Sequence, residues 1–151
     1  MAKTIVIAAD HGGFALKEKV KKILKKSRYK LEDKGTFSPE SCDYPEYGFN
    51  AGRMVSQGKA YRAIIICKSG IGMAVVANKL PGVRAGVCTS VEDAVSSRQH
   101  NDTNVLVLAA NKTSKEKAEE IIKVWLRTRT LGGRHSRRVK QIKALEKKVF
   151  K

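Results

Sequence analysis

A cysteine stands where an apolar run meets a glycine-rich loop in residues 64–79, IIICKSGIGMAVVANK. A thiol at this point is either a small apolar filler or a reactive group aimed at a ligand. Ser69-Gly70-Ile71-Gly72 follow Cys67 before residues that favour a helix. Such a strand–loop–helix unit points backbone N–H groups at an anion, and a helix N-terminus favours both an oxyanion and the thiolate form of a nearby cysteine. Lys68 would add positive charge at the same place.

Three other polar clusters could contribute to a site. Asp10 and His11 follow the apolar run 4–9, where they could contact a sugar hydroxyl or a phosphate, or instead cap a helix and form a polar loop. His100 lies in RQHNDTN, directly before another apolar run. His135 lies in GGRHSRR, which could bind phosphate or begin a solvated helix. Each of these signals is weak when taken alone.

Apolar runs alternate with helical patterns along the chain, which predicts a single α/β domain over residues 1–151. The apolar runs predict five strands near 4–9, 29–33, 62–67, 83–88 and 104–110. Apolar residues at helical spacing predict helices near 16–24, 44–57, 71–79, 91–99, 114–128 and 137–148. This alternation is typical of a parallel sheet with helices on both faces. Ligands bind such sheets beyond the carboxyl ends of the strands, where Asp10 and Cys67 fall.

The net charge of +17 is extreme for 151 residues and predicts an affinity for anions. Residues 17–34 contain nine lysines and arginines, and residues 123–151 contain eleven, with Glu146 as the single acid. The anion could be a phosphorylated small molecule or a nucleic acid. Most of these lysines could also form an ordinary solvated exterior.

Cysteine usage and hydropathy argue against several classes of protein. The three cysteines, Cys42, Cys67 and Cys88, form no CxxC pair, so neither a disulfide framework nor a zinc site is predicted. No run of 18 apolar residues is present, and the apolar run near the N-terminus is too short for a secretory signal. We therefore expect a cytoplasmic protein with no membrane span and no metal.

Five stretches, taken together, resemble one family. They are AADHGGFALKEKV, DKGTFSPESCDYPEYG, IIICKSGIGMAVVANKLPGVRA, SRQHNDTNVLVL and GGRHSRRV. The residues in these stretches, and the order of the stretches along the chain, resemble those of the type B ribose-5-phosphate isomerases. These enzymes are part of a group that includes galactose-6-phosphate and allose-6-phosphate isomerases. The resemblance covers nearly the whole chain. It implies a Rossmann-like three-layer αβα sandwich, no metal or organic cofactor, and a homodimer or homotetramer with the site at a subunit interface. The last helix would pack on its own domain or on a partner subunit.

The resemblance also implies roles in an aldose–ketose isomerisation of ribose 5-phosphate. Cys67 would be the general base that takes the C2 proton, and His100 would open the sugar ring with help from Ser69. The loop that holds the enediolate would consist of Gly70, Ile71, Gly72 and Met73. Contacts to the sugar or its phosphate would come from Asp10, His11, Tyr44 and Asn101. The phosphate clamp would consist of Arg134 and Arg138.

Two positions depart from the pattern of that family. Lys68 stands where a glycine is usual, and Asn111 stands where an arginine commonly contacts the substrate. Lys68 could favour the thiolate of Cys67, contact the phosphate in place of that arginine, or point into solvent. We count it among the candidate substrate-binding residues.

Three alternative functions stay open. The first is an isomerase of a six-carbon phosphosugar such as allose 6-phosphate or galactose 6-phosphate, since pocket depth decides between the two sizes. The second is a basic nucleic-acid-binding protein, which the net charge favours. It is less favoured overall, because the nine aromatic residues are not interleaved in the basic C-terminal segment and so provide no stacking platform there. The third is an inactive phosphosugar sensor, which the intact catalytic residues disfavour.

Overall fold

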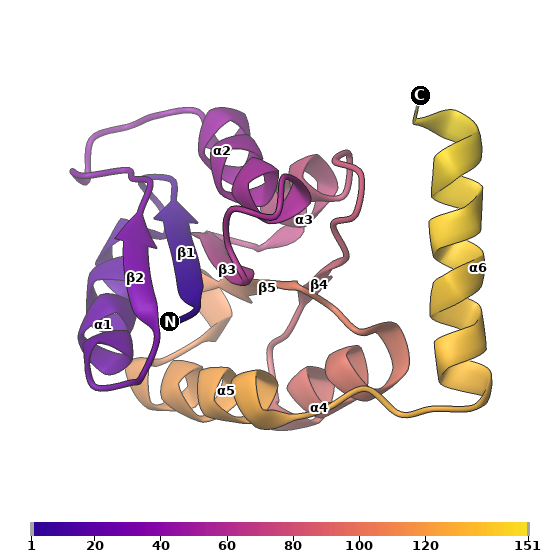
Figure 1. The fold of residues 1–151 in the computed structure, drawn as a ribbon. Helices are drawn as coiled ribbons and strands as arrows, with labels where there is room; N and C mark the ends of the chain where they lie inside the picture. Colours follow the sequence, from indigo (N-terminus) through magenta and orange to yellow (C-terminus); the bar gives the residue numbers. More distant parts are fainter. Residues whose placement is uncertain (1, 151) are drawn as a thin grey trace.

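A sheet of five parallel strands forms the middle layer of the protein in this computed structural model, which describes residues 2–150 (Figure 1). The strand order is β2-β1-β3-β5-β4. The strands are β1 (Thr4–Ala9), β2 (Lys30–Asp33), β3 (Arg62–Cys67), β4 (Ala85–Val87) and β5 (Val105–Ala109). All four strand pairs are parallel. The prediction of a five-stranded parallel α/β sheet is confirmed.

Helices cover both faces of the sheet. One face carries α1 (Phe14–Lys25), α4 (Val91–Asn101) and α5 (Lys115–Arg127), and the other carries α2 (Tyr44–Ser56) and α3 (Ile71–Ala77). Side chains alternate along each strand, so Ile5 and Ile7 join the core under α1 and α5, whereas Val6 and Ala8 join the core under α2 and α3. This is the three-layer αβα sandwich expected from the sequence. Among residues 2–150, no helix combines the length and apolar character that crossing a membrane requires.

The last helix, α6 (Arg134–Val149), lies on the side of the sheet where β4 is the outermost strand (Figure 1). It contacts α4, and its Glu146 Oε1 accepts a hydrogen bond of 2.9 Å from the Gly82 N–H. Val139 is the one buried residue of this helix. The helix begins three residues earlier than predicted, directly after Gly133, which has a φ of +64°. Arg134, His135 and Arg138 therefore share its first two turns.

Strand β4 is shorter than the predicted 83–88. The Val83 N–H donates to the Leu80 carbonyl in a turn, and the Arg84 N–H donates to the Asn104 side chain. Both N–H groups therefore already have hydrogen-bond acceptors outside the sheet, and the pairing with β5 begins only at Ala85. A short 3₁₀ helix, η1 (Ala110–Lys112), which was not predicted, follows β5.

The parallel topology separates the chain's polar clusters between two edges of the sheet. Cys67 pairs in register with Ala109, so both strands end at the same carboxyl edge. Helix α4 returns antiparallel to the strands, which places its last residues, His100 and Asn101, at the amino edge beside the start of β5. The two edges are about 13 Å apart, because four steps of about 3.3 Å separate Val105 from Ala109.

Candidate active site

The turn after β3 surrounds the thiol of Cys67. This side chain is buried, and its Sγ accepts a hydrogen bond of 3.2 Å from the Gly70 N–H. Gly70 has a φ of +79°, in the left-handed region where glycine is favoured. A Cβ on Gly70 would also lie 3.2 Å from Val87 Cγ1. The glycine thus allows the tight turn that aims an amide at the sulfur.

Ser69 lies on the exposed side of the same turn. Its Oγ accepts a hydrogen bond of 3.3 Å from the Ile71 N–H, and its side chain is open to solvent. The hydroxyl is therefore accessible to a ligand next to Cys67. A role for Ser69 in catalysis stays a prediction.

Loops from β1, β3 and β5 meet at this carboxyl edge. A Cβ on Gly12 would lie 3.3 Å from Lys68 Cβ and 3.4 Å from Asp10 Oδ1. The Asn111 N–H donates a hydrogen bond of 3.1 Å to the Lys68 carbonyl. The structure therefore brings Asp10 and Lys68 together beside Cys67, and it places Asn111 directly against Lys68.

Asp10 and His11 are both held by backbone contacts. Asp10 Oδ1 accepts a hydrogen bond of 3.1 Å from the Gly13 N–H, which orders the turn into α1. His11 Nδ1 accepts one of 3.1 Å from the Cys42 N–H, which ties the segment before α2 to the same edge. Asp10 thus holds the turn before Gly13, the N-cap residue of α1, and is not itself a side-chain cap of that helix. Contact with a ligand stays a prediction for both residues.

A buried ion pair fixes the loop that runs beside Asp10. The Lys17 ammonium is fully buried and contacts the Asp33 carboxylate, which also contacts Lys21 at 2.8 Å. Asp33 Oδ1 accepts from the Gly35 N–H at 2.8 Å, and the Gly35 carbonyl accepts from the Ala9 N–H at 2.7 Å. These contacts link α1, β2 and the end of β1 into one rigid unit around Asp10.

Tyr44 covers the start of α3. A Cβ on Gly72 would lie 2.7 Å from Tyr44 Cζ, so the ring packs directly on this glycine. Ile71 beside it is exposed. Met73 differs, because its side chain is fully buried and a Cβ on Gly48 would lie 2.7 Å from Met73 Sδ. Met73 can therefore face a ligand only through its backbone.

A second cluster of site candidates lies at the amino edge. The rings of His100 and His135 stack with centroids 4.3 Å apart and an angle of 13° between their planes. Loss of water contact lowers the pKa of His135, and the charges of His100 and of the two arginines lower it further. Arg134 and Arg138 are exposed, one turn apart on α6. The cluster is therefore an open, cationic surface suited to an anion.

His135 is the one member of this cluster with no assigned role in the sequence prediction. Its adjacency to Arg134 in GGRHSRR is the signal that could have included it. The stack itself depends on α4 and α6 meeting in space, which the spacing along the chain does not show.

We call the first cluster the thiol half-site and the second the guanidinium half-site. The thiol half-site consists of Asp10, His11, Tyr44, Asn111 and residues 67–73. The guanidinium half-site consists of His100, Asn101, Arg134, His135 and Arg138. Within one chain the structure does not bring these half-sites together, because they lie at opposite edges of the sheet. Among residues 2–150, no group of three or more His, Cys, Asp or Glu side chains is placed to hold a metal ion.

The chain is similar to known proteins over nearly its whole length. It matches the family described as Ribose/Galactose Isomerase over residues 5–142. Ribose-5-phosphate isomerase B of Escherichia coli is 40% identical over 146 residues, which cover 97% of this chain and 98% of that protein. The matched range includes every residue of both half-sites.

Solved structures show the same similarity. Ribose-5-phosphate isomerase B of Clostridium thermocellum has a TM-score of 0.93 and 43% identity, covering 96% of this chain and 98% of that one. The same enzyme type from Mycoplasma genitalium, solved with bound ribulose 5-phosphate, has a TM-score of 0.94 and 32% identity, covering 99% of both chains.

Proposed function

This chain belongs to the ribose/galactose isomerase family, and on that premise we propose that it interconverts ribose 5-phosphate and ribulose 5-phosphate. The relatives described above are named for this five-carbon substrate, which favours it over the six-carbon alternatives. The observation that carries the assignment is the buried Cys67 thiol, which has the Gly70 amide directed at its sulfur. The cytoplasmic location stays a prediction.

Cys67 acts as the general base in this proposal. The proton on C2, next to the C1 carbonyl, is weakly acidic, and its removal needs a base and donors for the oxyanion that forms. The thiolate takes the C2 proton and later returns it to C1, while a proton moves from O2 to O1. The electrons stay within the sugar, so the step needs no redox partner. The Gly70 N–H, which donates to the Cys67 Sγ, holds the sulfur in position for this transfer.

Ring opening and phosphate binding fall to the guanidinium half-site. The ring oxygen of the cyclic sugar must gain a proton while the C1 hydroxyl loses one, and an imidazole is suited to that exchange near neutral pH. His100 supplies it, and the stacked His135 orients its ring. Arg134 and Arg138 present forked donors one turn apart, which suits a phosphate dianion.

The complete site then requires two chains. Because the half-sites lie at opposite edges of one protomer, the guanidinium half-site of one chain must face the thiol half-site of its partner. A two-fold homodimer forms two such sites at once. Exposed apolar side chains on the helices that carry both half-sites support this arrangement, since Ile71 and Val75 on α3 and Leu145 and Val149 on α6 are more than half exposed. Packing of α6 on the partner follows from the same proposal.

Replacing Cys67 tests the catalytic assignment. Cys67→Ala should lower kcat by roughly 10²- to 10⁴-fold, the scale of a positioned general base, and should leave KM and the melting temperature close to wild type. Cys88→Ala is the matched control, because Cys88 is fully buried and burial raises the pKa of its thiol to about 11. A kcat for Cys67→Ala within a few-fold of wild type would remove Cys67 from this role.

Alkylation gives an independent measurement. Iodoacetamide should inactivate the enzyme by labelling Cys67, and ribulose 5-phosphate should protect it. Mass spectrometry should find Cys88 unlabelled in the folded protein, since a buried thiol with a raised pKa is unreactive. Inactivation that proceeds with Cys67 unmodified would contradict the assignment.

A further inference from the structure

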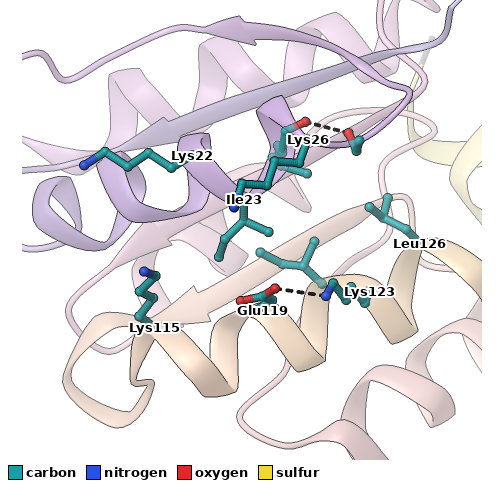
Figure 2. Close-up of a pocket in the computed structure, with 10 residues that line it drawn as sticks. Lys22, Ile23, Lys26, Lys115, Glu119, Lys123 and Leu126 are labelled. Atoms are coloured by element: carbon teal, nitrogen blue, oxygen red, sulfur yellow. Dashed lines mark hydrogen bonds and ion pairs between the residues drawn. The ribbon is translucent and has the colours of Figure 1, made fainter.

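A groove lined by lysines lies between α1 and α5, on a face that the isomerase site does not use. Figure 2 shows it, with a volume of about 360 Å³. Lys22 and Lys26 line it from α1, and Lys115 and Lys123 line it from α5. Apolar lining comes from Ile23 and Leu24 of α1 and from Ile122 and Leu126 of α5.

Most of the groove's positive charge is not neutralised within the protein. Glu119 pairs with Lys123 at 2.9 Å. This hydrogen bond lowers the pKa of the Glu119 carboxyl, and the nearby charges of Lys115 and Lys26 lower it further. In the chain as described, from residue 2 to residue 150, none of Lys22, Lys26 and Lys115 forms an ion pair. The groove is therefore an open cationic surface that one carboxylate does not balance.

A pair of aromatic rings includes a residue that follows the α1 wall of this groove directly along the chain. Lys26 and Ser27 line it, and the next two residues, Arg28 and Tyr29, line an adjoining hollow of about 240 Å³ together with Lys3. The rings of Tyr29 and Tyr61 stack with centroids 6.1 Å apart and an angle of 11° between their planes.

Cations accompany both tyrosine rings. The ammonium group of Lys3 lies 4.1 Å from the centroid of Tyr61, and the guanidinium of Arg28 lies 5.4 Å from that of Tyr29. Both rings are partly exposed. Tyr29 precedes β2 and Tyr61 precedes β3, so the fold assembles this tyrosine pair at the amino edge from two distant segments.

We propose that the lysine groove and the tyrosine pair together bind a single-stranded nucleic acid without sequence preference. A groove of unpaired cations that leads to stacked aromatic rings is the arrangement that such binding requires, with phosphates on the cations and bases on the rings. In the basic C-terminal segment 123–151, no aromatic residue stands between Trp125 and Phe150, and the sequence therefore disfavours this function. The stacking platform becomes visible only in the fold, beside the basic segment 17–34.

Other anionic partners fit this surface less well. A duplex keeps its bases stacked inside and would leave the tyrosine pair unused. A membrane would require protruding apolar side chains, whereas those of the groove are recessed between the helices. An acidic peptide would match the lysines but would gain nothing from stacked rings. The choice of a single strand therefore rests on Tyr29, one of the two stacked rings, following Lys26 and Ser27 of the groove along the chain.

Salt dependence provides the first test. Binding of a fluorescein-labelled single-stranded 12-nucleotide RNA to the full chain is followed by anisotropy between roughly 50 and 200 mM salt. Five unpaired cations line the surface, which are Lys3, Lys22, Lys26, Arg28 and Lys115. At about 0.7 released ions for each phosphate contact, log K should fall with log salt with a slope of about −3.5. A slope near zero would overturn the proposal.

Two charge-reversal variants locate the binding surface. Lys22→Glu with Lys26→Glu should weaken RNA binding about tenfold or more, since two phosphate contacts become repulsions. Lys79→Glu with Lys117→Glu is the matched control, because both lysines are exposed, lie outside the groove and change the net charge equally. The control should retain affinity within a few-fold, and all variants should keep isomerase activity. Equal losses in both variants would show non-specific attraction and overturn the proposal.

The ligand itself tests the tyrosine pair without altering the protein. An abasic oligonucleotide with the same phosphates should bind about tenfold more weakly, on the scale of lost base stacking. Tyr29→Leu should reduce affinity similarly, and Tyr29→Phe, which keeps the ring, should restore it. Equal affinity for the abasic strand, for the matching duplex or for ATP would overturn the assignment to a single strand.

Discussion

Mixing two inactive variants should restore isomerase activity if the active site combines half-sites from two chains. Cys67→Ala destroys the thiol half-site, and His100→Ala destroys the guanidinium half-site. Each homodimer then has two damaged sites. In a mixed dimer one site combines both lesions, while the other combines the intact Cys67 of one chain with the intact His100 of its partner. The mixed dimer therefore regains one working site.

The expected recovery follows from this geometry. Random exchange of equal amounts of two chains gives about half mixed dimers, and each has one intact site of two. Activity should therefore reach about a quarter of wild type in the unfractionated mixture and about half of wild type in the purified mixed dimer. Each variant alone should have a residual activity that is lower by roughly 10²-fold or more. The opposite edges of the sheet are about 13 Å apart, which is too far for one chain's His100 and Cys67 to share a single bound pentose.

The assay requires a purified mixed dimer and a control dimer that has no intact site. The variants are co-expressed with different affinity tags, the doubly tagged dimer is purified, and ketose formation from ribose 5-phosphate is measured. A dimer of the Cys67→Ala chain with a chain that carries both substitutions has no intact site and should stay inactive. Recovery near zero in a doubly tagged Cys67→Ala/His100→Ala dimer would refute the composite site.

Three further substitutions test the phosphate contacts and the buried ion pair. Arg138→Ala should raise KM for ribose 5-phosphate about 10- to 150-fold but leave the weak turnover of unphosphorylated ribose unchanged; an equal effect on both sugars would contradict the clamp. Lys68→Gly should raise KM for the phosphosugar several-fold at constant kcat if the lysine contacts phosphate, and an upward shift of the acidic limb of the kcat/KM profile would instead indicate action on Cys67. Burial alone would raise the pKa of Asp33, but the hydrogen bonds from Lys17 and its neighbour Lys21 outweigh burial and lower it. The ion pair therefore contributes its full stability at pH values above the pKa of Asp33 in the unfolded chain, which is about 3.9. This contribution is lost as the pH falls through the lower pKa that Asp33 has in the folded protein. Urea unfolding should show Asp33→Asn about 2 to 3 kcal/mol less stable than wild type at pH 7, with the gap closing in acid; a gap that is constant with pH would refute the linkage.

The central strands could be predicted because their sequences are continuous apolar runs, which are typical of strands buried on both faces of a sheet. The run at 62–67 is fully buried in β3, and those of β1 and β5 are buried almost throughout, as expected of parallel strands covered on both faces. The ends of β4 could not be predicted, since hydrogen bonds from a turn and from the Asn104 side chain take the amides of Val83 and Arg84. The start of α6 depends on the positive φ of Gly133, which no apolar pattern reports.

The candidate site was predictable in its residues but not in its arrangement. The positions of Asp10 and Cys67 at one edge follow from parallel strands alone. The opposite position of His100 also follows, once α4 is known to run back along the sheet. The stack of His100 on His135 depends on how α6 meets α4, and the burial of Met73 depends on a close contact with α2 at Gly48. Such long-range contacts have no signature in local spacing.

The contact between Tyr44 and Gly72 ties the variation of two distant positions together. A Cβ at position 72 would lie 2.7 Å from the Tyr44 ring, so an alanine there requires the ring to move. A single substitution at position 72 therefore displaces the Tyr44 ring from the start of α3, whereas a paired change that also shrinks residue 44 does not. Among homologues in which an aromatic ring keeps this position at residue 44, glycine should therefore be favoured at position 72. The two positions should thus evolve as one unit, although 28 residues separate them along the chain.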